Sequence, residues 1–203
     1  MAGRAPLARV IVLGGPSGSG KTRLAERLGL PVVPLDEFYK DGDDPTMPRI
    51  GGHLDWESPQ SWKLDAAMTA LEAICIDGTV EIPTYSYAEN RATGSRTITL
   101  TRTSTVTSRF VVTEGIFAAE VLAPLRSAGL LADAILIHNR RLTTFGRRLR
   151  RDLSDRRKPV RDILRIGVQK VQAEAAILRE LESAGCTPMS SRAAESRLRT
   201  LIS

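Results

Sequence analysis

A short stretch near the amino terminus, GPSGSGKT at residues 15–22, combines glycines, serines, a lysine and a threonine. Glycines let the backbone turn so that successive N–H groups point at a bound anion. The stretch fits the pattern G-x-x-x-x-G-K-[ST], in which the lysine reaches the β- and γ-phosphates of a nucleotide and the next hydroxyl binds Mg²⁺. The alternative is a glycine-rich turn with an exposed lysine. The expected phosphate-binding residues are Gly15, Ser17, Gly18, Ser19, Gly20, Lys21 and Thr22.

Two carboxylates follow apolar segments further along the chain. Asp36 comes directly after PVVPL, and Glu114 ends RFVVTE. Because parallel strands place their carboxyl ends along one edge of a sheet, we expect both residues to converge with Thr22. That arrangement suits phosphoryl transfer, with Asp36 as the general base and Lys21 at the phosphates. Thr22, Asp36 and Glu114 form the expected metal site. The alternatives are that Asp36 caps a turn and that Glu114 pairs with an arginine.

A basic segment, FGRRLRRDLSDRRKP at residues 145–159, carries most of its charge as arginine. On a helix, Arg147, Arg148 and Arg151 share one face. Arginines on a lid stabilise the charge that builds on a transferred phosphoryl group and exclude water. We expect arginines of this segment to have this catalytic role. The alternatives are contact with nucleic acid and a solvated basic face.

Residues 79–101 alternate in polarity on either side of ENRATG, which predicts a β-hairpin. Aromatic rings can sandwich a planar base, and an amide or a guanidinium can bond its edge. This lobe is therefore the expected binding site for the acceptor, the molecule that receives the phosphoryl group. The alternative is that its tyrosines pack between hairpin and sheet. The candidate acceptor-binding residues are Phe38, Tyr39, Tyr85, Tyr87, Asn90 and Arg91.

The elements that must position these residues alternate between strands and helices. Apolar, β-branched segments predict strands at 9–13, 31–35, 109–115 and 133–138, and a polar loop follows Leu35. Helical patterns occupy 20–29, 59–76, 118–128, 142–153, 160–184 and 190–202. We therefore expect an α/β fold of the P-loop NTPase type, a parallel sheet with helices on both faces. We expect residues 1–203 to form one domain, with the hairpin lobe at 79–101 and an arginine-rich helical lid at 142–159.

Composition narrows the class of protein. The chain has 203 residues, is 42% hydrophobic and carries a net charge of +6, which suits either nucleic acid or a small anion such as phosphate. Two cysteines predict no disulfide framework. The two histidines, His53 and His138, lack metal-type spacing, so we expect structural roles for them. Without a signal-like or membrane-length apolar run, the expected location is the cytoplasm.

Taken together, the motifs resemble the uridine kinase branch of the P-loop nucleoside kinases, which is related to phosphoribulokinase and bacterial pantothenate kinase. The matching segments span residues 10–158 and are GGPSGSGKT, LDEFYKD, DWESPQSW, PTYSYAENR, VVTEGIFA and RRLRRDLSDRR. That family transfers the γ-phosphate of ATP or GTP to the 5′-hydroxyl of uridine or cytidine. The resemblance implies ATP (or GTP) and Mg²⁺, a nucleoside acceptor, and no membrane or nucleic-acid partner.

The resemblance also implies roles for individual residues. Asp36 would be the base, and Glu114 would assist the metal. The catalytic arginines of the lid would be Arg148, Arg151 and Arg156. Tyr85 and Tyr87 would flank the pyrimidine, and Glu57 (or Asp55) would hold the ribose hydroxyls. This chain departs from the family pattern at Asn90, where the family has a histidine, and at Lys158 in place of an arginine. The family's late strand and adenine-side loop are not recognisable after residue 184. Rival functions are a kinase for pantothenate or a sugar, and a nucleotide-dependent nucleic-acid-binding ATPase.

Overall fold

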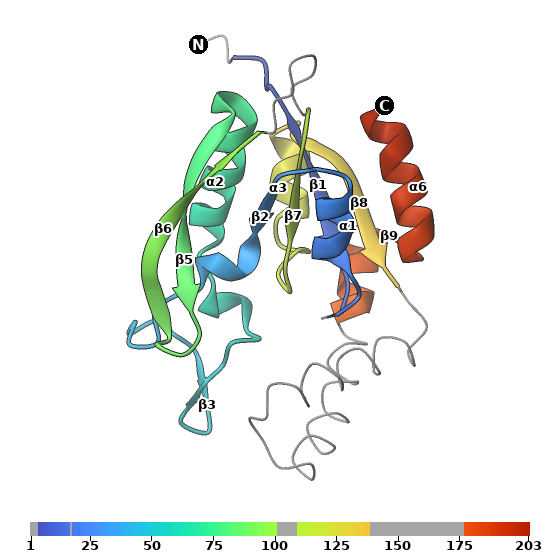
Figure 1. Cartoon of the computed structure of the whole chain (residues 1–203). Coiled ribbons are helices and arrows are strands. Elements are labelled where there is room, and N and C mark those ends of the chain that lie inside the picture. Colours follow the sequence, from blue (N-terminus) through green and yellow to red (C-terminus); the bar gives the residue numbers. More distant parts are fainter. Residues whose placement is uncertain (1–3, 17, 101–108, 139–176) are drawn as a thin grey trace.

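The structure, a computed structural model, describes residues 4–16, 18–100, 109–138 and 177–203. A sheet with the spatial order β2-β7-β1-β8-β9 lies at its centre. Every ladder in this sheet is parallel, so the carboxyl ends of the strands share one edge, the lower edge in Figure 1. The expected parallel α/β fold is confirmed. The strands are β1 (Arg9–Gly14), β2 (Val32–Pro34), β7 (Phe110–Glu114), β8 (Leu131–Ile137) and β9 (Thr187–Met189).

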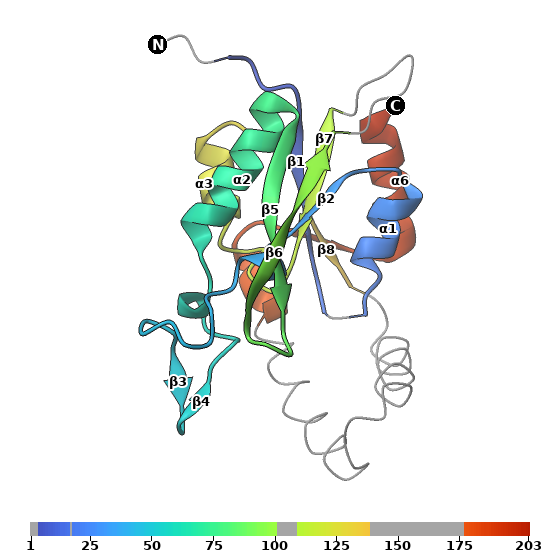
Figure 2. The same cartoon turned by 60° about the vertical axis from the view of Figure 1, so that its left-hand side comes forward.

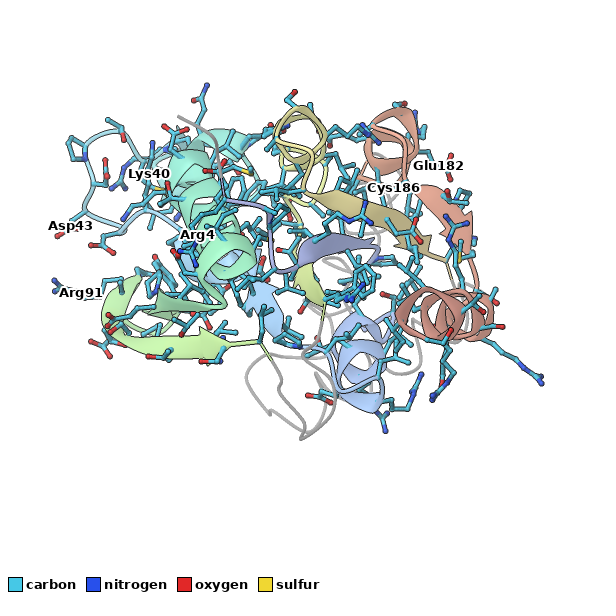
Figure 3. All side chains as sticks on the ribbon, turned by 90° about the horizontal axis from the view of Figure 1, so that it is seen from above. Arg4, Lys40, Asp43, Arg91, Glu182 and Cys186 are labelled. Atoms are coloured by element: carbon cyan, nitrogen blue, oxygen red, sulfur yellow. The ribbon has the colours of Figure 1, made fainter. Side chains whose placement is uncertain are left out.

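Helices cover both faces of the sheet because its strands are apolar on both sides. Val10 and Val12 of β1 belong to a core shared with α2 (Leu64–Asp77) and α3 (Leu122–Ser127). The residues between and after them, Ile11 and Leu13, belong to a second core shared with α1 (Lys21–Arg27) and α6 (Ser191–Ile202). Figures 2 and 3 show these helix pairs on opposite faces. Period-two alternation thus fills both cores from one strand.

A separate antiparallel hairpin follows α2, whose C-terminal cap is Gly78. Its strands are β5 (Thr79–Ser86) and β6 (Arg91–Thr99), in the region where alternation predicts a hairpin. Ile82 and Tyr85 of β5 are buried in the core on the α2 side. The pairing shifts register between Thr84 and Tyr85, which marks a bulge or irregularity.

Several boundaries differ from the sequence expectation. The segment expected as one helix over 59–76 begins with a 3₁₀ turn, η2 (Pro59–Ser61), before α2 starts at Leu64. The helix expected over 118–128 shortens to α3. The expected loop after Leu35 contains the 3₁₀ helix η1 (Leu35–Phe38) and two short paired strands, β3 (Arg49–Ile50) and β4 (His53–Leu54).

The late strand was missing from the sequence interpretation. β9 pairs with β8 at the edge of the described sheet, and residues 187–189 are mostly exposed. A segment of this kind carries little of the hydrophobic pattern that predicts buried strands. Residues 177–183 are helical, as expected. The expected helix at 142–153 and the lid at 142–159 lie outside the described residues.

No helix among the described residues has both the length and the apolar character that crossing a lipid bilayer would require. Cys75 and Cys186 are both buried free thiols, as expected for a chain without a disulfide framework. His53 and His138 are exposed.

Candidate active site

The phosphate-binding loop connects β1 to α1 at the carboxyl edge of the sheet. Gly15 and Gly20 have φ angles of 135° and 95°, a region that side-chain-bearing residues rarely adopt. A Cβ atom at Gly15 would lie 2.6 Å from the carbonyl oxygen of Ile137, so the loop passes too close to β8 for any larger residue. Gly18 and the buried Ser19 lie in the same turn. Of the expected phosphate-binding residues, Ser17 alone lies outside the described part of the chain.

Lys21 is buried at the base of this loop. Its Nζ donates to the carbonyl oxygens of Gly15, at 2.9 Å, and Pro16, at 3.3 Å. Burial lowers the pKa of its amino group, and the Glu114 and Asp36 carboxylates oppose that shift. Lys21 Nζ lies 3.7 Å from Glu114 Oε2. The lysine is therefore the positive centre that both carboxylates share.

Thr22 and Glu114 meet as the strand ends predict. The Thr22 hydroxyl donates to Glu114 Oε1 at 2.9 Å, although 92 residues separate the two in sequence. One strand residue earlier, the buried Thr113 hydroxyl donates to the Val33 carbonyl at 2.8 Å and fastens β7 to β2. This bond helps to place Glu114 beside the segment that carries Asp36. A hydroxyl and a carboxylate at this spacing are oxygen donors of the kind that Mg²⁺ prefers.

Asp36 sits on η1, immediately beyond β2. Its Oδ1 atom is buried and has no hydrogen-bond partner among the described residues, although the backbone N–H of Ile116 lies near the carboxylate. Burial, and then the charge of Glu114, raise the pKa of Asp36 from 3.8 to about 6. Ile116 and Lys21 only partly offset these effects. A buried carboxylate with a raised pKa and a spare acceptor atom can take a proton from a neighbouring hydroxyl.

Gly115 explains how Asp36 comes so close to β7. A Cβ atom at this position would lie 2.8 Å from Leu35 Cβ and 2.9 Å from Asp36 Oδ1. Only glycine leaves room for η1 to pack there. The sequence shows a glycine directly after the glutamate that ends this strand. The need for glycine there comes from its contact with Asp36, which lies 79 residues earlier and is not evident from the local sequence.

The donor set does not form a complete metal cage by itself. Within the described residues no group of three or more His, Cys, Asp or Glu side chains is arranged to hold a metal ion. This fits Mg²⁺, because Mg²⁺ in phosphoryl-transfer enzymes is bound by one or two carboxylates together with substrate phosphates and water. Thr22, Glu114 and Asp36 are therefore compatible with a metal that arrives with a nucleotide.

An aromatic cluster lies between η1 and the hairpin, with Tyr39 at its centre. The Tyr39 ring lies 5.3 to 6.0 Å from the rings of Trp56, Tyr85, Tyr87 and Phe117. Phe38, Tyr39 and Tyr85 are buried, as the packing alternative describes, whereas Tyr87 is 58% exposed. The Tyr87 hydroxyl donates to the Asp36 backbone carbonyl at 3.5 Å. Tyr87 is thus the aromatic side chain that is both accessible and next to Asp36.

The other expected acceptor residues are found at the hairpin turn and beside a pocket. Asn90, at φ 53°, lies in the exposed turn of the hairpin, and Arg91 is the exposed first residue of β6. Figure 3 shows Arg91 pointing away from the body of the molecule. Glu57 lines a pocket of about 190 Å³ whose apolar floor includes Ile116 and Phe117. Since Ile116 also neighbours the Asp36 carboxylate, this pocket is adjacent to the expected base.

Trp62 is a supporting residue that sequence reasoning treated only as part of a helix. Its Nε1 donates to the Leu35 carbonyl at 2.8 Å, and its ring stacks on Phe117 at 5.2 Å. Both contacts hold η1 in place. The expected lid arginines Arg148, Arg151 and Arg156 lie outside the described residues.

Solved structures with a similar fold share little sequence with this chain. One, titled a putative fructose transport system kinase from Silicibacter sp. TM1040, has a TM-score of 0.57 and 21% identity, covering 92% of this chain and 88% of its own. The YGR205w protein has a TM-score of 0.52 and 16% identity, with 91% and 86% covered. A possible uridine kinase from Bacillus stearothermophilus has a TM-score of 0.47 and 18% identity, with 71% and 76% covered. At these identities the likeness to the first two structures shows the fold alone.

No curated protein sequence matches the chain. The model of the family described as "Phosphoribulokinase / Uridine kinase family" matches residues 10–186. The match begins within β1 and includes the phosphate-binding loop, both carboxylates and the hairpin. Because it extends over well more than half of the sequence, the chain belongs to the phosphoribulokinase/uridine kinase family of P-loop kinases.

Proposed function

We propose that this kinase transfers the γ-phosphate of ATP (or GTP), with Mg²⁺, to a hydroxyl group of a small molecule, and that the acceptor is the 5′-hydroxyl of uridine or cytidine. The observation that carries the proposal is the convergence of Lys21, Thr22, Asp36 and Glu114 at the mouth of the phosphate-binding loop. These groups supply the cation, the metal ligands and the proton acceptor that such a transfer needs.

In this reaction the acceptor oxygen forms a bond to the γ-phosphorus, and the bond from that phosphorus to the bridging oxygen of the nucleoside diphosphate breaks. Asp36 takes the proton of the acceptor hydroxyl. Lys21, together with the loop amides, binds the phosphates. Thr22, Asp36 and Glu114 would hold Mg²⁺, which would neutralise part of the phosphate charge when bound.

The acceptor would occupy the space next to Asp36. The pocket lined by Ile116 and Phe117 would receive the acceptor, and Glu57, which also lines it, would accept hydrogen bonds from the ribose hydroxyls. Phe38, Tyr39, Tyr85 and Tyr87 would form the wall beside the pyrimidine, with Asn90 and Arg91 at the hairpin turn. We further propose that Arg148, Arg151 and Arg156 close over the phosphates.

A second candidate is a kinase for a different hydroxyl compound, such as a sugar or pantothenate. Two observations favour this second candidate. Arg91 points away from the sheet, and the described pocket is lined by the carboxylates Glu57, Glu120 and Glu180. Carboxylates accept hydrogen bonds from polyol hydroxyls as readily as from ribose.

A transfer assay separates the candidates. The purified protein is incubated with Mg²⁺, γ-labelled ATP and single acceptors: uridine, cytidine, pantothenate or a set of sugars. We expect labelled nucleoside monophosphate from uridine or cytidine. If only pantothenate or a sugar becomes labelled, that compound replaces the nucleoside as the acceptor. Hydrolysis without transfer to any acceptor, by folded protein, would reject a small-molecule kinase of this range.

Two variants test the site itself. Asp36→Asn should lower kcat by about 100-fold or more while ATP still raises the melting temperature, because the base is lost and the phosphate site remains. Lys21→Met should abolish the ATP-dependent melting shift. An unchanged kcat for Asp36→Asn would eliminate Asp36 as the base.

A further inference from the structure

Glu37 lies next to the proposed base on η1 and contacts the hairpin. Its Oε2 atom accepts a hydrogen bond from the backbone N–H of Tyr85 at 2.6 Å. Its Oε1 atom accepts one from Arg96 Nη2 at 3.0 Å. The single carboxylate therefore contacts both strands, β5 through Tyr85 and β6 through Arg96. Its side chain is 19% exposed, whereas that of Arg96 is 48% exposed.

The place of contact on β5 is distinctive. The β5–β6 pairing shifts register between Thr84 and Tyr85, and the Tyr85 amide donates to Glu37. A bulge disrupts a ladder locally and leaves backbone groups in need of partners. The Glu37 carboxylate supplies such a partner as a charge-assisted acceptor, a stronger bond than one between neutral groups.

Glu37 is the first of several residues in the segment 37–42 that form hydrogen bonds with the hairpin. The Lys40 carbonyl accepts from the Tyr85 hydroxyl at 3.0 Å. Further along, Asp41 Oδ1 accepts from the Ala92 N–H at 2.9 Å, and the Gly42 N–H donates to the Asn90 carbonyl at 2.6 Å. Among these bonds, the Glu37–Arg96 contact is the one that joins two charged side chains.

We propose that Glu37 is a positioning residue that fastens the acceptor hairpin to the segment bearing the base, so that Tyr85, Tyr87 and Asp36 keep a fixed geometry. The Tyr87 hydroxyl contact to the Asp36 carbonyl lies within the same unit. Without Glu37 the hairpin would remain folded but shift relative to η1. The proposal rests on the proposed function, in which Asp36 is the base and the hairpin forms part of the acceptor site.

The kinetic test compares Glu37→Ala, Glu37→Gln and Arg96→Gln with the wild type, using the acceptor that the transfer assay identifies. Displacement of reacting groups by a fraction of an ångström to 1 Å reduces turnover strongly. We expect Glu37→Ala to lower kcat/KM for the acceptor by about 10-fold or more, with KM for ATP within about twofold of wild type. Glu37→Gln keeps an oxygen for the Tyr85 N–H and should recover part of the loss.

A double-mutant cycle then isolates the Glu37–Arg96 contact. In the Glu37→Gln background, Arg96→Gln should add little further loss, because the charge pair is already broken. Glu81→Gln is the matched control, since Glu81 is an exposed glutamate on β5 that bonds Ser95 and contacts neither η1 nor Asp36 in any described bond. It should leave both kinetic constants unchanged. Unchanged acceptor constants for folded Glu37→Ala would overturn the proposal.

A measurement independent of activity keeps the two proposals apart. Hydrogen exchange of the peptide that spans the hairpin should be faster in Glu37→Ala than in the wild type and in Glu81→Gln. Faster exchange together with a wild type that phosphorylates no acceptor would support the tether and reject the proposed function. Exchange that matches the wild type would reject the tether, whatever the activity.

Discussion

The buried position of Asp36 lowers the free energy of unfolding when its carboxylate is ionised. Its ordinary pKa is 3.8, and burial together with the Glu114 charge raises it to about 6. Between these values the unfolded chain loses the proton while the folded protein keeps it. The free energy of unfolding therefore falls as the pH rises through this window, and the ionised carboxylate remains a constant penalty above it. A shift of about two units corresponds to roughly 3 kcal/mol as an upper value.

We therefore expect Asp36→Asn to stabilise the metal-free protein at pH 8 by about 2–3 kcal/mol, and by much less at pH 4. Urea unfolding in the presence of EDTA at the two pH values measures the difference. Asp43→Asn serves as the control, because Asp43 is exposed on the outer loop (Figure 3). Equal or lower stability of Asp36→Asn at pH 8 would contradict an energetically costly carboxylate.

At the scale of elements, the close packing of η1 against the end of β7 sets the position of Asp36, the proposed base. Gly115 permits this packing because a Cβ would contact both Leu35 and Asp36. The Trp62 indole and the Thr113 hydroxyl hold the same junction through the carbonyls of Leu35 and Val33. Three separate contacts thus fix a single short 3₁₀ helix.

Gly115→Ala should displace η1 and lower kcat by about 10- to 100-fold, while the ATP-dependent melting shift persists. The phosphate-binding loop follows a different strand, β1, so we expect this variant to bind the nucleotide. Gly94→Ala is the control, because a Cβ on this β6 glycine would meet no atom within 4 Å. If Gly115→Ala has wild-type kcat, the packing at this position does not set the geometry of Asp36.

The features that sequence reasoning found are those that depend on strand ends. Thr22, Asp36 and Glu114 each follow or end an apolar run, and the parallel-edge rule brings such residues together. The features that it missed depend on contacts between distant side chains. Glu37 and Arg96 are 59 residues apart in sequence and no local pattern connects them. The edge strand β9 was missed because a three-residue, mostly exposed segment has too little apolar periodicity.

Across the part of the chain that the structure describes, several surface arginines are paired with carboxylates. Among the described residues, surface arginines pair with carboxylates on different elements, including Arg197 with Asp133 at 2.6 Å and Arg27 with Glu195 at 2.8 Å. Arg199 also pairs with Glu195, and Arg4 with Asp77. Such pairs reduce the charge available to a polyanion. The net charge of +6 by itself suits either a small phosphate ligand or a nucleic acid, so binding of oligonucleotides has to be measured directly.

We expect single-stranded RNA and DNA oligonucleotides to bind weakly, with a Kd above about 10 μM at 150 mM salt, and to leave ATP turnover unchanged. Fluorescence anisotropy across a salt series provides the measurement, with ATP-dependent phosphoryl transfer measured in parallel. Tight binding with a steep salt dependence, accompanied by stimulated ATP hydrolysis, would favour the nucleic-acid-dependent ATPase instead.

The two cores on opposite faces of the sheet have a consequence for protein engineering. The hairpin, Tyr39 and Trp62 pack into the core of α2 and α3, whereas α1, which begins with Lys21, packs with α6 into the other. Libraries that redesign acceptor choice can thus be confined to one layer without repacking the layer beneath the nucleotide loop. Selection for new alcohols should then proceed with the phosphate donor preference intact.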